Sequence, residues 1–546
     1  MLRSEIIRGI LERRGIPADG LEAFLHPSIA DLARPEDLPG VVAAADVVLS
    51  AVSGSREIVV FGDYDCDGVS ATAILSRTLR ALGGKVSEFI PDRLSEGYGM
   101  SVDSVARMRK ENPGVGLVVT VDNGINSVEA VDELKAKGVG VVVTDHHLPG
   151  EELPRADALI DPKVSAPKHL ESLCGAGVAF LLANRLMTEA KRRGLYAGPC
   201  IGGPLLVLAG LATVTDIMPL LGQNRILVAE ALRRFSTSAP MGLKELHARA
   251  ARTGVVNLTS RDFGFMLGPR INAAGRMATA MEALELVLSE DREITRELAR
   301  MIDGYNAERK TIEQRMTDEA MSKVVEGAAA QVIDLPSGHP GIAGIVAARV
   351  MERLNGAVPV CVLAGGHGSA RAPEALNIRD AFVACSADLS TFGGHAAAGG
   401  FTVRPGRIDS FRERLCAYCR GILGEDPVAR SKTESAVRVD AWVRPEDITL
   451  ELADEIRLLE PFGTGNPEPV LGLKDVGFAD VKPLGLDGRH LSVTLRNSGL
   501  RAVQWQHGDL VEKLRAESAR LHDITFTLSV SEYGERHVEL RLTGIY

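Results

Sequence analysis

The sequence predicts an α/β protein of several domains: a parallel-sheet domain, a long connector helix, a smaller α/β domain and a C-terminal β-barrel. Strand and helix patterns alternate over residues 57–160. A polar segment at about 281–326 carries apolar residues at roughly heptad spacing, which indicates a long helix. Residues 436–546 hold mostly alternating strand-like runs separated by turn signals. The chain has 546 residues, too many for one hydrophobic core.

The first domain is predicted to be an open parallel sheet. Its strands are continuous runs of β-branched and apolar residues, which is typical of strands buried on both faces. Helix-like segments of about ten or more residues separate them, as parallel crossovers require. Ligands of such sheets bind beyond the carboxyl ends of the strands. The predicted strands lie at 57–63, 85–91, 116–122 and 139–145.

The domain boundaries are expected where these patterns change. A helix of about 30 residues in the connector region would be about 45 Å long, enough to join two domains. The polar stretch 423–435 is predicted to be a linker. The expected order is an N-terminal helical segment at 1–45, the first α/β domain at 46–235, a helical region with the connector at 236–330, the second α/β domain at 331–425 and the barrel at 436–546.

The composition fits a globular protein, with 45% hydrophobic and 25% charged residues. There is no apolar run of membrane-spanning length and no signal-peptide core, so we expect a cytoplasmic location and no membrane partner. A net charge of -10 argues against an indiscriminate nucleic-acid coat, but not against a nuclease whose metal ligands are acidic. The seven cysteines are scattered. Cys416 and Cys419 form the one CxxC and are predicted to lie on one helix as reduced thiols.

The strongest chemical signal is GDYDCDGVSATA, residues 62–73. Asp63, Asp65 and Asp67 alternate just after the first strand, and in an extended segment that spacing places all three on one side. Clustered carboxylates raise one another's pKa unless a cation neutralises them. Hard divalent cations seek such oxygen ligands. An acidic surface turn would explain one Asp-Gly pair, but it fits three alternating aspartates poorly.

More candidate ligands follow the next strands. Asp122 ends VVTVD, and Asp145, His146 and His147 end VVVTDHH, while Asp216 lies in ATVTDIMPL. Singly, Asp122 could be a helix N-cap and Asp216 a turn residue, and a lone histidine is usually structural. Three groups of candidates nevertheless follow three strands of one parallel sheet, and they therefore open onto the same edge. The groups are Asp65 with Asp67, Asp122, and Asp145–His147. Two cations roughly 4 Å apart can share a carboxylate and promote in-line phosphodiester hydrolysis. Imidazole among the ligands favours manganese.

These motifs resemble a known superfamily. GDYDCDG, VDNG, TDHH and TVTDIMP are similar, in order, to the four motifs of the DHH phosphoesterases, and residues 339–349 and 392–400 resemble the DHH-associated domain. GPRINAAGRM (268–277) and EPFGTGNPEPV (460–470) are similar to the RecJ family of bacterial single-strand-specific DNA exonucleases. The resemblance covers about residues 45–475. It implies a DHH catalytic domain, a DHH-associated substrate-binding domain and an OB-like nucleic-acid-binding barrel.

The resemblance implies two divalent cations, Mn²⁺ or Mg²⁺. Asp122 would bridge them. Asp65 would complete the first site, and Asp67, His146 and Asp216 would complete the second.

The resemblance also implies residues that support the reaction. Asp63 would be a ligand or a support of the ligands, and Asp145 would lie behind them. His147 would orient ligands or help proton transfer. Arg276 would reach the scissile phosphate, and His395 would grip a phosphate from the second domain. The expected catalytic residues are Asp122, His147, Arg276 and His395.

The expected substrate contacts centre on a 5′-phosphate pocket. Arg93, Ser369 and Arg371 match positions of such a pocket in the family, and guanidinium groups suit a terminal phosphate. Without the resemblance, a surface ion pair is the simpler reading of each arginine. The expected substrate-binding residues are Arg93, Asn272, Ser369, Arg371, Gly393 and Gly394.

Three positions depart from patterns of the superfamily. Phe61 replaces a histidine found four residues before the first metal aspartate in many members, which fits RecJ and argues against the pyrophosphatase branch. Gly338 replaces a tryptophan usual in RecJ, and Ala372 replaces a serine. The last two bear on the contacts of the second domain and not on the metal site.

The resemblance implies a 5′-3′ exonuclease that releases mononucleotides from single-stranded DNA in repair and recombination. A monomer is expected, with a single-stranded-DNA-binding protein and a recombination helicase as candidate protein partners. Aromatic residues are only 4% of the chain, so backbone contacts should dominate, with Trp505 either a stacking platform or a core residue. The alternatives are a nano-RNase or cyclic-dinucleotide phosphodiesterase of the same superfamily, and a non-catalytic replication scaffold.

Overall fold

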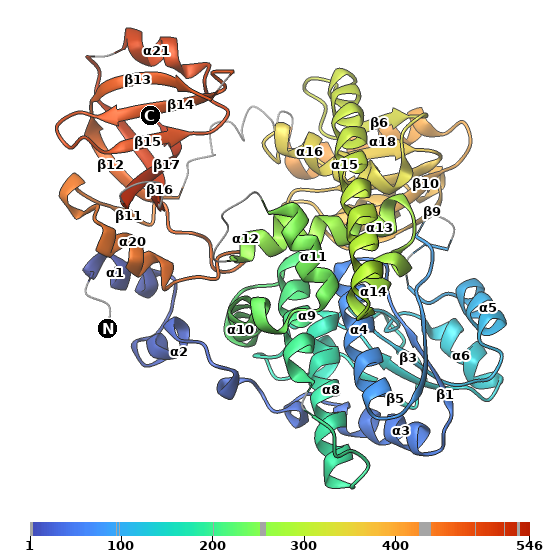
Figure 1. Ribbon diagram of the computed structural model, residues 1–546. Coiled ribbons are helices and arrows are strands. Elements are labelled where there is room, and N and C mark those ends of the chain that lie inside the picture. The colour runs from blue at the N-terminus through green and yellow to red at the C-terminus, as the bar shows by residue number, and fades with distance from the viewer. Residues whose placement is uncertain are drawn as a thin grey trace.

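The computed structural model forms three bodies, a lower α/β body, a second α/β body above it and a C-terminal β body beside them (Figure 1). Each has its own sheet. No helix of the described chain is long and apolar enough to span a bilayer. The structure describes residues 4–93, 96–97, 99–199, 201–251, 258–424, 438–485, 487–517, 519–531 and 536–546.

The first sheet is parallel throughout, in the order β2-β1-β3-β4-β5. The four predicted strands are confirmed, and β5 is a short strand that the sequence did not reveal. Alternate residues of β1 face opposite sides: Ile58 and Val60 pack under one helical layer, and Val59 and Phe61 under the other. Burial on both faces explains the continuous apolar runs. The strands are β1 (Glu57–Phe61), β2 (Lys85–Phe89), β3 (Val115–Thr120), β4 (Gly140–Thr144) and β5 (Ala158–Ile160).

Helices cover both faces of this sheet. One layer is thin and contains α5 and α6. The other is thick, because further helices pack behind those that touch the sheet. The thin layer consists of α5 (Val102–Glu111) and α6 (Val128–Ala136). The thick layer includes α3 (Val41–Ser53), α4 (Cys66–Ala81), α8 (Gly175–Arg192), α9 (Gly202–Thr215), α10 (Gly222–Ser238), α11 (Met241–Ala250) and α14 (Ala280–Leu288).

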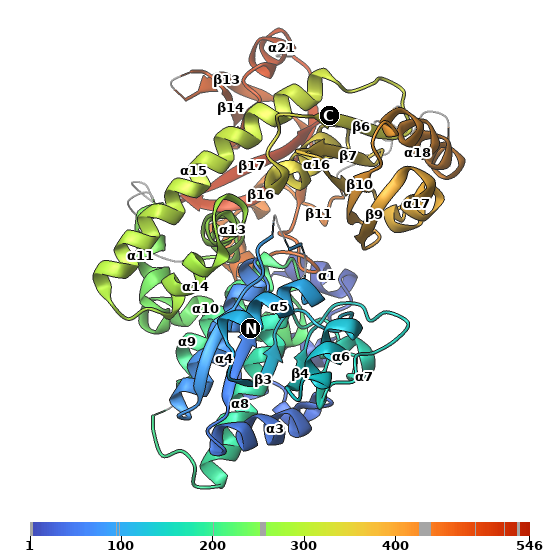
Figure 2. The same cartoon turned by 90° about the vertical axis from the view of Figure 1, so that its right-hand side faces the viewer.

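The connector is α15 (Arg292–Ser322), a helix of 31 residues that runs between the two α/β bodies (Figure 2). Leu298 belongs to the core of the first body and Met316 to that of the second. The predicted connector helix of about 30 residues is therefore confirmed. Asp291 caps it by accepting hydrogen bonds from Glu293 N and Ile294 N, and this cap separates it from α14.

The second body has a mixed sheet in the order β6-β7-β8-β10-β9, in which only β6 and β7 pair in parallel. Cys416 and Cys419 lie on α18 as free thiols, as predicted. Most of the predicted linker, 423–435, lies outside the described residues. The elements are β6 (Gln331–Leu335), α16 (Pro340–Arg353), β7 (Val360–Ala364), β8 (His367–Arg371), α17 (Ile378–Ala384), β9 (Leu389–Gly394), β10 (Ala398–Val403) and α18 (Ile408–Leu423).

The C-terminal body is a seven-stranded sheet, which confirms the prediction of a β domain. Its order is β11-β12-β16-β17-β15-β14-β13. Trp505 follows β15 and is 56% exposed, so it is not a core residue. The elements are β11 (Ala441–Trp442), α20 (Leu450–Arg457), β12 (Leu471–Val476), β13 (Phe478–Leu484), β14 (His490–Leu495), β15 (Arg501–Gln504), α21 (Leu510–Ala516), β16 (His522–Ser531) and β17 (His537–Ile545).

The N-terminal segment packs against the C-terminal β body, on the side of α20 (Figure 1). Ile7 and Ile10 of α1 (Glu5–Arg13) and Phe24 of α2 (Leu21–Leu25) share a core with the β strands. Ser4 N also donates to Glu455 Oε2 over 3.0 Å. The sequence predicted helices here but gave no partner for them.

A buried arginine of α10 joins the first body to this N- and C-terminal assembly. The Arg225 guanidinium donates to the carbonyl oxygens of Phe24 (2.7 Å), Leu459 (3.0 Å) and Glu460 (2.8 Å). It also lies 3.9 Å from the centroid of the Phe24 ring. The carbonyls just after α20 carry the negative end of that helix, which favours a cation. Burial lowers the pKa of Arg225 only to about 10, so it stays charged.

Arg225→Met is expected to loosen the attachment of the C-terminal body. Each buried carbonyl left without a donor costs about 1–3 kcal/mol, so local opening should rise on the order of 10²-fold. Limited proteolysis should detect this as faster release of the C-terminal body. Arg234→Met on the same helix is the control, because Arg234 makes only a half-exposed ion pair with Glu230. Equal cleavage rates in the two variants would contradict the role given to Arg225.

Candidate metal centre

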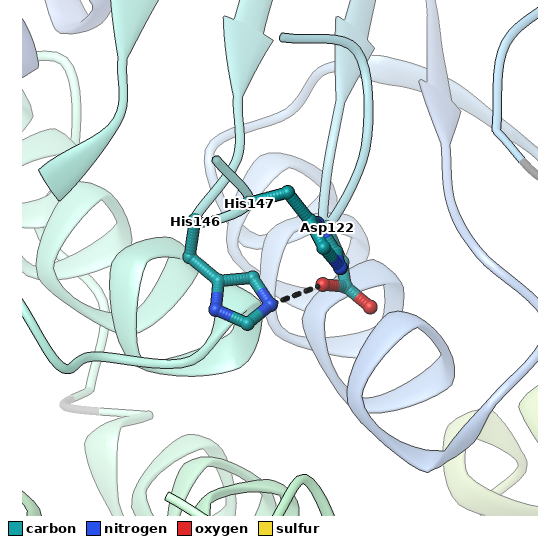
Figure 3. A group of neighbouring side chains, drawn as sticks. All are labelled: Asp122, His146 and His147. Carbon is teal, nitrogen blue, oxygen red and sulfur yellow. Dashed lines mark ion pairs between the residues drawn. The ribbon is translucent and has the colours of Figure 1, made fainter. Parts of the chain in front are cut away.

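The predicted strand ends meet at one edge of the first sheet. Asp122 follows β3, and His146 follows β4. His146 Nε2 lies 3.0 Å from Asp122 Oδ1, and these two side chains point at each other (Figure 3). The same nitrogen lies 3.6 Å from Asp67 Oδ2 and 3.6 Å from Asp216 Oδ2. One imidazole is therefore surrounded by three carboxylates that come from distant parts of the chain.

Several groups of side chains could each hold a cation. Within each group, one ligand atom per residue lies within 4.8 Å of the others. Asp122 belongs to two of these groups, as a bridging ligand would. His147 belongs to one, although the sequence placed it outside the ligands. The groups are Asp63–Asp65–Asp122, Asp67–His146–Asp216 and Asp122–His146–His147.

The prediction of an extended Asp63–Asp67 segment is wrong. Helix α4 begins at Cys66, so Asp65 is its N-cap and Asp67 lies in its first turn. Asp65 Oδ1 accepts from Asp67 N (2.9 Å) and Gly68 N (3.0 Å). Capping satisfies amides at the helix start that would otherwise lack acceptors, and this outweighs continuation of the strand. The aspartates converge through a strand-to-helix turn and not through alternation.

The start of α8 supports the cluster from behind. Gly175 N and Ala176 N both donate to the Asp67 carboxylate over 2.7 Å. A side chain at Gly175 would lie 2.6 Å from Asp122 Cβ and Oδ1, so only glycine allows this approach. The sequence around Gly175 does not reveal this role, because it depends on a contact between segments that are distant in the chain.

Asp122 is held in an unusual backbone conformation. Its φ is +60°, which is rare for residues other than glycine, asparagine and aspartate. Asp122 does not cap a helix, so the alternative prediction that it is only a helix N-cap is wrong. The adjacent Asn123 side chain donates to Val121 O (2.8 Å) and Phe61 O (3.3 Å), and so ties the turn to the ends of β3 and β1. The VDNG motif thus fixes Asp122 at the centre of the edge.

The buried carboxylates carry the electrostatic signature of a cation site. Burial, and then the neighbouring carboxylates, raise the pKa of Asp122, of Asp67 to about 6 and of Asp216 to about 9. The pKa of Asp63 is also raised well above its usual range, by burial and by Asp65. Asp63 Oδ1 and Asp216 Oδ2 are buried and accept no hydrogen bond from any residue that the structure describes. Carboxylate and imidazole donors together fit Mn²⁺ or Mg²⁺.

The two histidines differ in charge. Burial lowers the pKa of His146 to about 3, which keeps it neutral as a ligand must be. Burial is the largest single effect on His147 and lowers its pKa, but the 2.7 Å hydrogen bond to Asp145 and the charges of the nearby aspartates together outweigh it and raise the pKa to about 9. Asp145 is fixed in turn by Ile125 N, which donates to Oδ2 over 2.9 Å. Asp145 therefore orients the ring of His147.

The second body faces the metal centre through His395. Its ring stacks on that of His147, with centroids 6.0 Å apart. His395 follows Gly393 and Gly394, the latter at a φ of +130°. Arg276 links the bodies, since its Nη1 donates to Gly341 O of α16 over 3.0 Å.

Three predicted arginines gather near the cluster. Burial and then the charge of Arg93 lower the pKa of Arg276, to about 9, and that of Arg371. Arg93 stacks 4.6 Å from the ring centroid of Tyr64. Cations held this close repel each other, so the group favours a bound anion.

The other predicted contacts have structural partners. Asn272 Oδ1 accepts from Cys66 N over 2.7 Å, so it holds the start of α4. Ser369 and Arg371 lie on β8, and Arg371 packs against α16 at Gly344. Gly338 has no room for a side chain, because a Cβ there would lie 2.9 Å from Leu335 O and from Met316 Cε. Ala372 is buried, and its N–H donates to Ala397 O.

Two charged residues near the metal centre, Asp161 and Lys163, were not among the residues predicted from the sequence. Asp161 directly follows β5, and its pKa rises to about 7, mainly through burial and despite a hydrogen bond from Lys163 N. The charge of Lys163 acts on His146, Asp216 and His395. The sequence ALIDPK at the end of a fifth parallel strand could have placed both at this edge.

Comparisons with known proteins agree with this geometry. Residues 57–200 match the DHH family, N-terminal domain, and residues 439–544 match the RecJ OB domain. The chain is 34% identical to the single-stranded-DNA-specific exonuclease RecJ of Dickeya dadantii, over 93% of this chain and 91% of that protein. The chain belongs to the RecJ family. The RecJ of Bacillus subtilis is also 34% identical over 97% of this chain, which spans 66% of that longer relative.

A solved RecJ structure supports the whole arrangement. The RecJ of Thermus thermophilus in complex with Mn²⁺ matches with a TM-score of 0.84 at 32% identity, over 99% of this chain and 76% of that one. A complex of the same RecJ with Mg²⁺ matches with a TM-score of 0.78 at 30% identity, over 99% of this chain and 74% of that one. The expected DHH and OB domains are confirmed by the family matches, and RecJ membership makes this chain a metal-dependent nuclease.

Proposed function

We propose that the chain is a 5′-3′ exonuclease of single-stranded DNA that releases mononucleotides with the help of two divalent cations. The observation that carries the proposal is the buried cluster in which Asp122 belongs to two ligand groups. The printed names of the relatives, single-stranded-DNA-specific exonucleases, supply the substrate class.

The donor set divides into two cation sites. Asp63 and Asp65 would hold one cation together with Asp122, and His146 would join Asp67, Asp216 and Asp122 on the other. When bound, such cations lower the pKa of water and stabilise charge on the attacking and leaving oxygens of an in-line displacement.

The surrounding side chains would position the substrate. Asp145 raises the pKa of His147 and holds its ring, so His147 can donate a hydrogen bond to a phosphate oxygen. The ring of His395 stacks on that ring and would contact the same phosphate from the second body.

A 5′-phosphate would bind among Arg93, Arg276 and Arg371. A dianionic phosphate offsets the repulsion of these guanidinium groups, and each can donate two hydrogen bonds to it. Binding of a terminal phosphate beside the metal centre would set the direction of digestion, because cleavage then removes the nucleotide at that end.

The wider setting is part of the proposal. We infer that the enzyme acts in DNA repair and recombination in the cytoplasm, as a monomer. A single-stranded-DNA-binding protein and a recombination helicase are the protein partners that would present its substrate. A dinucleotide-specific phosphodiesterase would have little use for the C-terminal OB domain, and a non-catalytic scaffold would have little use for a complete set of ligands.

Digestion of end-labelled oligonucleotides tests the proposed function. With Mn²⁺, a label at the 5′ end of single-stranded DNA should be released in mononucleotides before a label at the 3′ end is released. A 5′-phosphate should raise the rate over a 5′-hydroxyl, and Arg371→Gln should remove that preference. Arg404→Gln, just after β10, is the exposed-arginine control. First release of a 3′ label, or efficient cleavage of dinucleotides only, would overturn the proposal.

A further inference from the structure

A cavity of about 660 Å³ lies between the end of α9, the segment before α13 (Gly268–Met277) and the C-terminal body. Ile217 and Phe265 line it from the first body, and Arg541 of β17 lines it from the other. Ile217 directly follows Asp216 of the metal cluster, so the cavity adjoins the metal centre. None of the predicted site residues lies in its wall.

Two large apolar side chains are exposed in this cavity. Phe265 is 76% exposed and Ile217 is 70% exposed. Ile217 also has a φ of +59°, which is a steric outlier for a β-branched residue. Strained residues persist where surrounding structure enforces them, and they cluster at ligand sites. Neither exposure nor strain helps the fold, which points to a ligand that covers these side chains.

The backbone is built to present Phe265. Residues Phe263–Leu267 form one turn of π-helix between α12 (Ser260–Asp262) and α13. Phe263 and Leu267 are buried, whereas Phe265 points outward. Gly268 packs directly on Thr215, which fixes this turn beside the residue that precedes Asp216. Single π-helical turns occur often at functional sites.

We propose that Phe265 and Ile217 form a stacking platform for one base of the single strand, next to the nucleotide being cleaved. This inference rests on the proposed function. An aromatic face stacks on any base, which suits an enzyme without sequence preference. Arg261 lies 5.7 Å from the Phe265 ring centroid. Arg261 and Arg541 line the cavity together with Glu460 and Glu468, so the apolar face and not a net positive charge carries the platform. An apolar peptide would also cover Phe265, but continuity with Asp216 favours the strand whose phosphate lies at the metals.

Abasic substrates test the platform. We would measure KM and kcat with Mn²⁺ on 5′-phosphorylated single strands that carry one abasic residue at successive positions. Phe265→Ala should raise KM about 5- to 100-fold on intact DNA. At one position along the strand, an abasic residue should raise the KM of the wild type by the same factor. At that position it should not raise the KM of Phe265→Ala any further. Phe265→Trp should retain the wild-type KM, since it keeps a stacking face.

Two further variants separate binding from folding. Val383→Ala on α17 truncates another exposed apolar side chain, away from the cavity, and should leave KM unchanged. Ile217→Gly should raise KM while raising thermal stability, because glycine adopts positive φ without strain. Suppose that the wild type degrades single strands, but that an abasic residue raises the KM of Phe265→Ala by the same factor as that of the wild type at every position. The platform is then wrong. If wild type does not degrade single strands at all, the proposed function fails instead.

Discussion

Asp122→Asn is expected to lower kcat on single-stranded DNA by on the order of 10³-fold or more. Asp122 belongs to two ligand groups and lies 3.0 Å from His146 Nε2. Asparagine keeps the shape but not the charge that two cations would share. Loss of metal-based charge stabilisation costs several kcal/mol, and each 1.36 kcal/mol is a factor of ten in rate. Initial rates at saturating Mn²⁺ and DNA measure the effect.

The matched control for this prediction is Asp132→Asn. Asp132 is an exposed aspartate on α6 of the same body, so its variant changes net charge equally without touching the cluster. It should retain wild-type kcat. Full activity in Asp122→Asn would rule out a shared carboxylate at this position.

Gly175→Ala is expected to weaken Mn²⁺ binding by roughly 10- to 100-fold, as loss of support around metal ligands does. A methyl group there would lie 2.6 Å from Asp122 Cβ, so either Asp122 or the start of α8 must move. Moving α8 would withdraw the amides that hold Asp67. Alanine favours helix more than glycine does, so any loss is specific to the site. Calorimetric titration with Mn²⁺ measures the affinity.

Gly177→Ala serves as the comparison on the same helical turn. Its new methyl group would meet the flexible end of Leu173 at 3.3 Å, which can shift slightly. Mn²⁺ affinity should stay near that of wild type. Equal affinities in Gly175→Ala and Gly177→Ala would show that the close approach of α8 to Asp122 is unimportant.

The parallel sheet could be predicted because its residues carry the information locally. β1 is buried on both faces, so its apolar run is continuous, and Asp122 and His146 follow strands whose order fixes a common edge. The packing of α1 could not be predicted, because an amphipathic helix does not specify its partner. The connector helix could be predicted from its heptad spacing, and the Asp291 cap marks its start.

The chemistry of the site was easier to predict than its geometry. The types and order of the ligands are visible in the sequence, but the turn at Asp65 depends on helix capping that competes with strand extension. Gly175 and Phe265 were missed for a different reason. Gly175 acts through its contact with Asp122, and the turn that carries Phe265 is fixed where Gly268 packs on Thr215; these partners are distant in sequence and become neighbours only in the folded chain.

The most direct test of a shared Asp122 is the electron paramagnetic resonance spectrum of the protein loaded with Mn²⁺. Two cations that share one carboxylate lie roughly 4 Å apart, so their spins should couple, with two Mn²⁺ bound per chain. Asp122→Asn should lose the coupled signal. A wild-type spectrum of isolated Mn²⁺, with one ion per chain, would contradict the two-cation site.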